Sequence, residues 1–358
     1  MPTLSICIPT HDGRARVLDR ALASATQQLG ADLRERVQFC VSDNGSRDST
    51  TAVLERHRAK LGEALVTHRF EADVGFTTNL LKVVELAEGD FCWLLGSDDT
   101  LEPGALATVM TILDEEPDLT GITVNRINVD DADPPGVMHD DPRVVPPSAR
   151  RRYESPEAVF AELALLQDYI STQILRRTAW QRAVAKLGQE GVEAGGAFPH
   201  IPILGAMVIE APRWRWHGEQ LVRHRIGVAA VKGTFPVSPA EYIIKVTHDR
   251  STIWAAMFGV RSSLYRAAMS SARRTQLSPA MIGHFKLQPE QTLAGDLRLL
   301  VAMTRQYWRL AEFWTQSLPA LLVPHGFVPV AVRAMQALRS AADRGRHGTR
   351  VPEDERAA

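Results

Sequence analysis

Two neighbouring aspartates, Asp98 and Asp99, follow Gly96-Ser97 directly after the apolar run 91–95. Paired carboxylates at the end of a buried strand repel each other unless a cation or hydrogen-bond donors compensate them. Mg²⁺ and Mn²⁺ prefer oxygen ligands and combine one or two protein carboxylates with water and substrate phosphate oxygens. A helix cap formed by Asp99 is the simpler alternative. We favour a divalent metal at Asp99, because other acidic strand ends are expected nearby.

Three further clusters of polar residues end apolar runs earlier in the chain. In a doubly wound sheet the carboxyl ends of the strands meet at one crevice, where loops present side chains to a ligand. Asp43 suits hydrogen bonds from a nucleobase or ribose, although Asp-Asn-Gly is also a common turn composition. For Asp73 and Gly75, a helix cap and a flexible turn explain the pattern equally well. The residues expected at the crevice are Pro9, Thr10, Asp12, Asp43, Asp73, Gly75, Ser97, Asp98 and Asp99.

The elements that must position these residues alternate between short apolar runs and helix-length amphipathic segments. This alternation predicts βαβ units and a doubly wound, mainly parallel sheet of the α/β class. Residues 129–152, rich in Asp, Pro and Arg, are predicted to form a mobile loop. The expected strands are 4–8, ended by Pro9, then 37–41, 64–67, 91–95 and 122–127, and the expected helices are 16–28, 49–60, 75–87 and 103–115.

Four stretches within about the first 105 residues carry a family resemblance when they are taken together and in order. They are residues 5–10, 41–50, 73–76 and 93–99. In combination they resemble inverting family 2 glycosyltransferases with the GT-A fold. The Leu-Leu-Gly-Ser-Asp-Asp sequence at 94–99, with residues 170–175 and Trp180, looks most like the abequosyltransferase-type branch, which decorates bacterial polysaccharides.

The resemblance implies transfer of a hexose-type sugar from a nucleoside-diphosphate sugar to an acceptor hydroxyl, with inversion. A Mn²⁺ or Mg²⁺ ion would bridge the diphosphate oxygens and stabilise the departing nucleoside diphosphate. By resemblance, the nucleotide site is lined by Pro9, Thr10 and Asp12, the base is held by Asp43, the ribose or sugar is faced by Asp98, and the metal is bound by Asp99.

An inverting reaction also needs a general base within hydrogen-bond reach of the attacking hydroxyl. The family commonly supplies an aspartate from the second half of the domain, and this chain has no clear Glu-Asp pair there. The glycine-rich window 193–200 offers Glu193 and His200 instead. His200 is the better candidate chemically, because its ordinary pKa lies near neutrality, although a lone histidine is more often structural.

The overall composition excludes several classes of protein. The 41 basic residues nearly balance the 42 acidic ones, so no global field marks a nucleic-acid partner. No Gly-x-Gly-x-x-Gly follows the first strand, and no P-loop motif occurs. The three cysteines are expected to be buried, reduced thiols, and no basic, apolar leader precedes the first strand. These features predict a cytoplasmic protein.

The C-terminal third has a different character. We expect a catalytic domain over residues 1–235, a mostly helical region over 236–345 and a disordered tail over 346–358. Residues 321–335 are apolar, contain two prolines and precede several arginines, a pattern typical of peripheral contact with an anionic membrane. Such contact would suit a lipid-linked acceptor. Core packing and a homodimer interface are the alternatives.

Two functional hypotheses remain open at this level. The first is the transferase, whose acceptor is a polysaccharide end, a lipid-linked saccharide or a small molecule such as a secondary metabolite. The second is a protein of the same fold that binds nucleotide sugars without turning them over, because the expected aspartate base is missing. One sequence does not specify the donor sugar, which a few loop contacts select.

Overall fold

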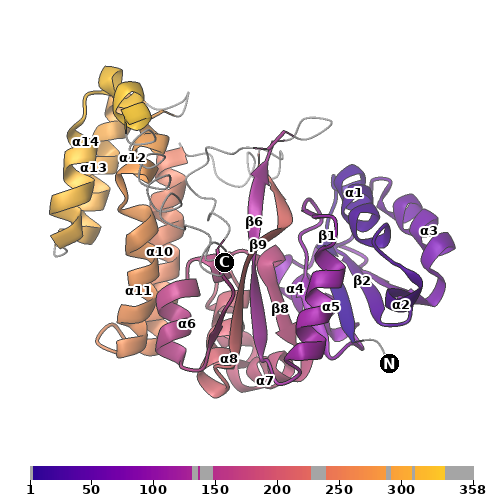
Figure 1. The fold of residues 1–358 in the computed structure, drawn as a ribbon. Helices are drawn as coiled ribbons and strands as arrows, with labels where there is room; N and C mark the ends of the chain where they lie inside the picture. The colour runs from indigo at the N-terminus through magenta and orange to yellow at the C-terminus, as the bar shows by residue number, and fades with distance from the viewer. Residues whose placement is uncertain are drawn as a thin grey trace, which may run out of the picture. The chain divides into compact units, whose positions relative to one another are not determined.

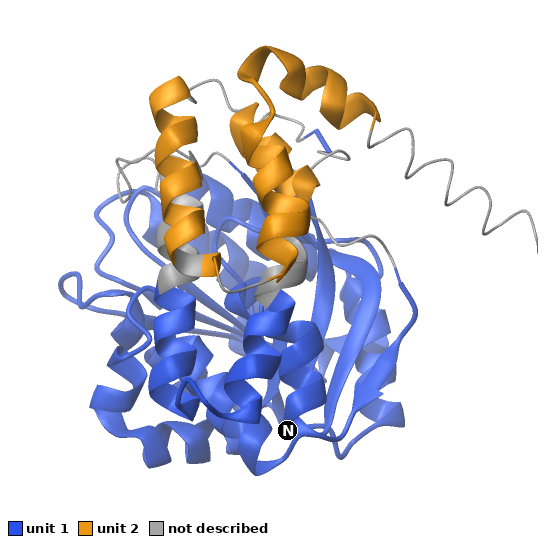
Figure 2. Cartoon of the chain, turned by 90° about the vertical axis from the view of Figure 1, so that its left-hand side faces the viewer, with its two compact units in different colours: residues 1–234, 248–272 blue, residues 235–247, 273–358 orange. Residues whose placement is uncertain are grey.

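The computed structural model describes residues 3–130, 136–137, 148–226, 239–287, 292–308 and 311–334. The chain divides into two compact units, coloured separately in Figure 2. The first comprises residues 1–234 and 248–272, and the second comprises residues 235–247 and 273–358. The predicted tail at 346–358 and most of the predicted loop at 129–152 lie outside the described residues.

The first unit begins with the predicted alternation of strands and helices. Apolar runs form strands because both faces of each are covered, and amphipathic segments form the helices between them. The elements are β1 (Leu4–Thr10), α1 (Ala15–Thr26), α2 (Ala31–Arg34), β2 (Val37–Asp43), α3 (Thr50–Leu61), a 3₁₀ turn (Gly62–Ala64), β3 (Leu65–Arg69), α4 (Phe76–Glu85) and β4 (Phe91–Leu94).

The predicted end of the first strand is wrong. Pro9 does not end the first strand, because β1 continues to Thr10, with Pro9 opposite Ser42 and Thr10 opposite Asp43 of β2. A proline removes one backbone donor and is tolerated near the end of a strand, where few ladder hydrogen bonds remain. The extension carries Thr10 to the same level as Asp43.

The second half of the unit extends the sheet with mixed strand directions. Its elements are β5 (Thr100–Leu101), α5 (Ala105–Glu115), β6 (Gly121–Val129), β7 (Arg151–Tyr153), α6 (Pro156–Leu163), two 3₁₀ turns (Leu166–Asp168 and Ile170–Thr172), β8 (Gln173–Arg176), α7 (Arg177–Glu193), α8 (His200–Glu210) and β9 (Trp214–Arg225). The strand order is β3-β2-β1-β4-β8-β6-β9-β5, with β7 on β9. The pairs from β3 to β4 and the β6–β9 pair are parallel, and β8 inserts antiparallel. The α/β class is confirmed.

Helices cover the sheet on both faces. Leu4, Ile6 and Ile8 of β1 belong to a buried cluster that also contains the inner faces of α1, α3 and α5. Figure 1 shows α5 lying against this side of the sheet. Helix α4 contacts β1 and β2, and its buried Leu80 and Val83 are outside that cluster. The two covered faces leave the strand ends as the place for polar side chains.

Close packing of β6 on β9 depends on a glycine. A Cβ atom at Gly121 would lie 2.4 Å from the ring of Trp214, so only glycine fits opposite this buried tryptophan. The Trp214 indole N–H donates to Thr123 Oγ1 at 2.9 Å, which satisfies the ring inside the core. The fixed register carries the far end of β9 to His224 and Arg225, beside the strand-end loops.

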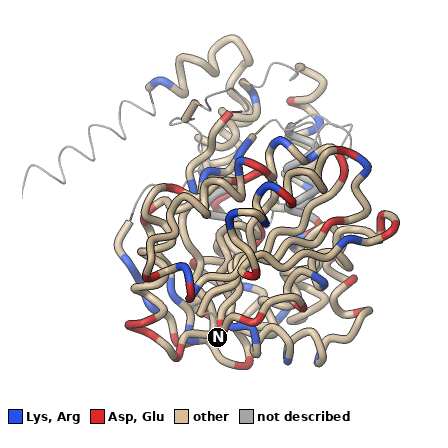
Figure 3. Tube along the Cα trace, turned by 90° about the vertical axis from the view of Figure 1, so that its right-hand side faces the viewer, with Lys and Arg blue, Asp and Glu red and all other residues tan. Residues whose placement is uncertain are grey.

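Figure 3 shows basic and acidic residues interspersed along the described trace, with neither sign gathered on one side of that view.

The second unit is helical in its described part. Helices α10 (Pro239–Phe258) and α11 (Ser263–Gln276) each contribute residues to both units. The second unit continues with α12 (Pro279–Lys286), α13 (Leu293–Tyr307), a π-helical turn (Phe313–Ser317), α14 (Leu318–Leu322) and a 3₁₀ turn (His325–Phe327).

Candidate active site

The carboxyl ends of the parallel strands bring distant residues into one row. Thr10 lies opposite Asp43, and Asp43 lies opposite Arg69 at the end of β3. On the other side of β1, Cys7 pairs with Leu94, so the chain leaving β4 passes the same edge before it reaches Asp98. The sheet register therefore gathers the predicted clusters at the edge where ligands bind in open α/β sheets.

Thr10 and Asp43 form a buried ledge with unsatisfied polar atoms. Asp43 Oδ1 accepts hydrogen bonds from the backbone N–H of Ser46 at 3.1 Å and from the Ser46 hydroxyl. Asp43 Oδ2 has no hydrogen-bond partner and lies 3.5 Å from Arg69 Nε. Thr10 Oγ1 and Asn79 Oδ1 are also buried without partners, although Asn79 Nδ2 donates to the Thr10 carbonyl at 2.9 Å. Buried polar atoms left unpaired are costly, so a ledge of them points to a ligand.

The neighbouring loops are fixed by two other predicted aspartates. Asp12 is exposed, and its Oδ1 accepts the backbone N–H groups of Arg47 and Asp48 at 2.8 and 3.0 Å. Asp73 accepts from the Asn44 amide at 2.6 Å and from the Gly75 N–H at 2.8 Å. These donors, the Gly75 N–H first, lower the pKa of Asp73. Both carboxylates thus hold the loops that border the ledge.

The remaining predicted residues have mainly backbone roles in this structure. Gly75 precedes α4 with a φ of +82°, in the left-handed region that favours glycine. Pro9 is buried in β1, and Ser97 is buried in the turn between β4 and β5.

Asp98 is held by an arginine from the first helix region. Arg14 Nη1 lies 2.5 Å from Asp98 Oδ2, and the Asp98 side chain is 26% exposed. Burial and then the neighbouring charge of Asp99 raise the pKa of Asp98, while Arg14 opposes the rise. Asp98 is consequently the partly accessible member of the acidic pair, and its charge responds to any cation that approaches.

Asp99 is almost completely buried and surrounded by donors. Its Oδ2 accepts the Tyr169 hydroxyl and the Ser171 hydroxyl, the latter at 2.5 Å. Its Oδ1 accepts the Arg225 backbone N–H at 3.1 Å and lies 3.5 Å from His224 Nδ1. Burial opposes ionisation, but the His224 ring and the two hydroxyls together lower the pKa of Asp99. The carboxylate is therefore preorganised in its charged form.

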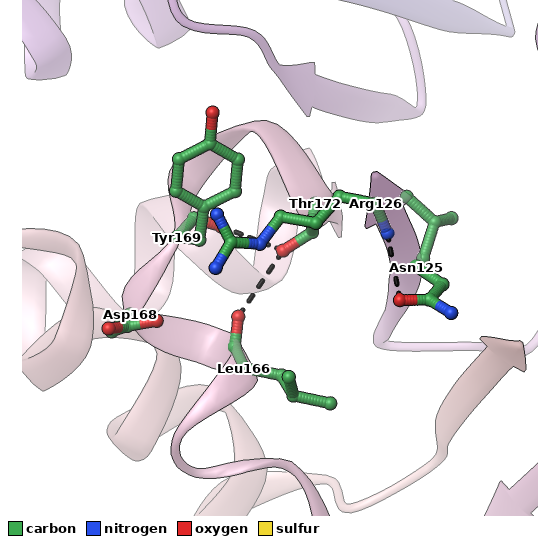
Figure 4. Close-up of a pocket in the computed structure, with 7 residues that line it drawn as sticks. Asn125, Arg126, Leu166, Asp168, Tyr169 and Thr172 are labelled. Carbon is green, nitrogen blue, oxygen red and sulfur yellow. Dashed lines mark hydrogen bonds between the residues drawn. The ribbon is translucent and has the colours of Figure 1, made fainter. Parts of the chain in front are cut away.

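Tyr169 links this network to the strand β6. Its hydroxyl is also within hydrogen-bond distance of His224 Nδ1, and the two rings meet edge to face at 4.3 Å. The Arg126 guanidinium stacks 4.3 Å from the centre of the Tyr169 ring. Figure 4 shows both side chains at a small pocket whose lining also includes Asn125, Asp168 and Thr172, with the Tyr169 hydroxyl directed away from it. Burial, with the Asp99 charge, raises the pKa of Tyr169, so the phenol keeps its proton and acts as a donor.

The acidic pair and His224 are of ligand types that suit a divalent metal. Two carboxylates and one imidazole are suitable donors for Mn²⁺, and burial lowers the pKa of His224, which keeps the imidazole neutral. Both oxygens of Asp99 already accept protein donors, so Asp99 can bind a metal only by exchanging one of them. Among the described residues, no group of three or more His, Cys, Asp or Glu side chains is arranged to hold a metal ion. A metal bound here would have to take most of its ligands from water and phosphate.

The surroundings of the two predicted bases, His200 and Glu193, do not favour general-base catalysis. His200, at the start of α8, is 2% exposed, and its Nε2 is 2.9 Å from the Asp168 carbonyl. Burial lowers its pKa to about 3. Glu193, at the end of α7, is exposed and accepts the Gln189 amide at 2.8 Å. A general base needs a pKa near the working pH, and the pKa of His200 lies far below it. These surroundings therefore favour a structural role for His200.

Several residues that contact the acidic pair were not predicted from the sequence. Tyr169, Arg14 and Arg126 have no local motif, because each reaches the site through contacts distant in sequence. Ser171 belonged to a stretch recognised by resemblance, without an assigned role. The sequence signal that could have drawn attention to His224 is its position between Arg223 and Arg225. Arg223 donates to the Glu102 carboxylate at 2.7 and 3.1 Å.

Residues 5–180, which contain Thr10, Asp43 and the Asp98–Asp99 pair, match the model of glycosyl transferase family 2. The chain carries a family 2 glycosyltransferase domain. It is 35% identical over 116 residues to abequosyltransferase RfbV of Salmonella typhimurium, a match that covers 32% of this chain and 34% of that protein. It is also 28% identical over 130 residues to chondroitin synthase of Escherichia coli, covering 36% of this chain and 18% of that one. These matches span about a third or less of each relative.

Solved structures resemble the domain in fold. S. aureus TarS residues 1–349 in complex with UDP-GlcNAc has a TM-score of 0.54 at 18% identity, covering 86% of this chain and 88% of that one. The mannosyltransferase PcManGT from Pyrobaculum calidifontis, in complex with GDP-Man and Mn²⁺, has a TM-score of 0.50 at 16% identity, covering 94% and 81%. The GT-A fold predicted for this domain is confirmed.

Proposed function

We propose that this domain transfers a sugar from a nucleoside-diphosphate sugar to an acceptor hydroxyl. The observation that carries the proposal is the buried ledge of Thr10 and Asp43, with its unpaired polar atoms, on the same sheet edge as the Asp98–Asp99 pair. A nucleobase offers donors and acceptors to the ledge, and a diphosphate needs the cation that an acidic pair can hold. The family assignment supports the same chemistry.

The proposed nucleotide contacts follow from the atoms left unpaired. Asp43 Oδ2 accepts a donor from the base or ribose, and Thr10 Oγ1 donates or accepts beside it. Arg69 Nε lies 3.5 Å from Asp43 Oδ2 and places a positive charge beside this contact. Asp12 and Asp73 act indirectly, since their hydrogen bonds fix the loops around this contact.

We include a Mn²⁺ or Mg²⁺ ion, held by Asp99 with Asp98 and His224 beside it, in the proposal. When bound, the metal supplies positive charge to the diphosphate leaving group. The protein's own part is to keep Asp99 ionised through Tyr169 and Ser171 and to hold Asp98 in place through Arg14. The Mn²⁺ in the PcManGT complex supports this part of the proposal by analogy of fold.

The proposed reaction also includes inversion and a general base. The resemblance implies single displacement with inversion, which requires a base on the acceptor side. His200 and Glu193 remain our sequence-based candidates, and the burial of His200 weighs against it. The same observation favours the second candidate function, a nucleotide-sugar-binding protein without turnover.

The donor and acceptor are proposed at the level of class. Solved structures of similar fold are in complex with UDP-GlcNAc and GDP-Man, so we propose a nucleoside-diphosphate sugar as donor. The similarity to abequosyltransferase RfbV and to chondroitin synthase, both of bacteria, leads us to propose a bacterial saccharide, free or lipid-linked, as acceptor. A cytoplasmic location agrees with the three free, buried cysteines, Cys7, Cys40 and Cys92.

A turnover assay separates the two candidate functions. The full chain is incubated with UDP-, GDP-, dTDP- and CDP-sugars, with Mn²⁺ or chelator, and with a bacterial glycolipid extract as the acceptor source. Release of nucleoside diphosphate that requires the extract and is lost in Asp99→Asn supports the transferase. Nucleotide binding without any acceptor-dependent release supports the binding protein.

A further inference from the structure

The second unit exposes many large apolar side chains for its size. Leu293, Leu297 and Val301 of α13 and Trp308, the residue directly after it, recur at helical spacing on one stripe, with exposed fractions of 77, 61, 42 and 52%. Trp314, Leu322, Phe327 and Val330 in the following segment are each more than half exposed. An exposed apolar surface of this density marks an interaction site rather than ordinary surface.

A bent pair of helical segments carries the second group. No single helix among the described residues passes a length-and-hydropathy test for crossing a membrane, but Phe313–Leu322 and His325–Ala334 pass it together and meet at 99°. The sequence from 313 to 332 contains no Asp, Glu, Lys or Arg. The pair therefore presents a long uncharged surface.

The bend is stabilised by a buried lysine. Lys286 Nζ donates to the carbonyl oxygens of Leu321 and Val323 at 2.8 and 2.7 Å and lies 3.3 Å from the Asp296 carboxylate. The carbonyl groups freed where the helix breaks are thus satisfied inside the protein. Beside the bend lies an apolar cavity of about 310 Å³, lined by Gly283, Pro319, Ala320, Val323, Val328 and Val332 among others.

Charge distinguishes the kind of partner that suits this surface. Residues 293–350 contain eight arginines and only three acidic residues. A second copy of the chain would bring the same arginines to a symmetric interface, where like charges repel. An anionic bilayer attracts arginines, accepts tryptophan at its interface and offers hydrocarbon to the exposed leucine and phenylalanine side chains.

We propose that the α13 stripe and the bent pair form a docking surface for an anionic lipid bilayer, with the cavity receiving a lipid hydrocarbon chain. The surface lies in the second unit and does not depend on the transferase reaction. Docking would place the enzyme where lipid-linked saccharides occur.

Vesicle flotation with the full-length chain tests this proposal. The vesicles are phosphatidylcholine with or without phosphatidylglycerol, and the variants are Leu322→Asp combined with Phe327→Asp, and the milder Leu322→Ser combined with Phe327→Ser. Val260→Asp, at a 60% exposed apolar position of the first unit, is the matched control. Circular dichroism verifies that each variant is folded.

We expect the wild type and Val260→Asp to float with the anionic vesicles, and the aspartate variant to bind at least about tenfold less, with the serine variant between them. Added salt should weaken the wild-type binding. The proposal would be overturned if the wild-type protein bound neither kind of vesicle, or if a folded aspartate variant floated like the wild type. Self-association of the wild type that the variant abolishes, without vesicle binding, would instead identify a dimer interface.

Discussion

The two aspartates at the centre of the site, Asp43 and Asp99, are both buried but differ in what surrounds them. Asp43 keeps one carboxylate oxygen without a hydrogen-bond partner, and the neighbouring Thr10 hydroxyl is unpaired as well. Asp99 has both oxygens occupied by protein donors, with the hydroxyls of Tyr169 and Ser171 on Oδ2. Asp43 can therefore accept a further hydrogen bond without losing one, whereas both oxygens of Asp99 already accept hydrogen bonds from the protein.

This difference indicates two modes of ligand binding on one sheet edge. At Asp43 a ligand gains a buried hydrogen bond without displacing another, which favours direct recognition of a base. At Asp99 a ligand must exchange with a preorganised donor, which favours a strongly charged species such as a metal ion over a neutral group. We therefore propose that Asp43 recognises the base and that Asp99 stabilises charge.

The largest expected effect is that of Asp99→Asn. The amide keeps the volume of the side chain but removes its charge, so turnover with a nucleotide sugar should fall about a hundredfold and Mn²⁺ should no longer strengthen donor binding. Turnover and calorimetric titration measure the two effects. Asp118→Asn, which removes a carboxylate bound to Arg152 outside the site, serves as the control. Metal dependence like that of the wild type would contradict the metal role of Asp99.

Asp43→Asn tests whether Asp43 contributes to nucleotide binding independently of the metal. Replacing the unpaired carboxylate oxygen should lower nucleotide affinity about tenfold, because a charge-assisted hydrogen bond is lost, while the Mn²⁺ concentration needed for half-maximal binding stays the same. Titration of nucleotide at several metal concentrations measures both quantities. A changed metal requirement with unchanged nucleotide affinity would reverse the roles assigned to the two aspartates.

A smaller effect is expected for Tyr169→Phe. Without the phenol, Asp99 Oδ2 loses one protein donor, and a metal no longer has to exchange with it. The Mn²⁺ concentration for half-maximal activity should fall about fivefold, equivalent to a hydrogen bond of about 1 kcal/mol. Activity measured across a Mn²⁺ series tests this. A higher metal requirement would mean that Tyr169 positions Asp99 rather than competes for it.

The smallest effect on turnover is expected for His200→Asn, whose consequence is for stability. In the unfolded chain His200 binds a proton below pH 6.5, whereas burial lowers its pKa in the folded state to about 3. The folded state therefore loses stability as pH falls from 6.5 towards 3, by up to about 1.4 kcal/mol per pH unit. Denaturant unfolding of the variant between pH 7 and pH 4 should show a shallower decline. Loss of turnover with intact donor binding would instead restore His200 as the base.

The parts of the site that follow strands were predictable from the sequence, and the parts that enclose them were not. Thr10, Asp43 and Asp99 stand within four residues of the end of an apolar run, and parallel strands bring such positions together whatever the rest of the fold does. The network around Asp99 depends on Tyr169 and His224, which lie 70 and 125 positions further along the chain. Their approach is set by the antiparallel insertion of β8 and by the β6–β9 register, and no local pattern encodes either.

The proposed nucleotide-sugar site is tested first by calorimetric titration of the wild-type chain with UDP, GDP and dTDP, each with Mn²⁺ and with chelator. We expect one of these nucleotides to bind, chelator to weaken its binding, and Asp43→Asn to weaken it with the metal present. If folded protein binds none of them, Ser97-Asp98-Asp99 is a buried hydrogen-bonded turn, and the assignment of this sheet edge to a nucleotide sugar is contradicted.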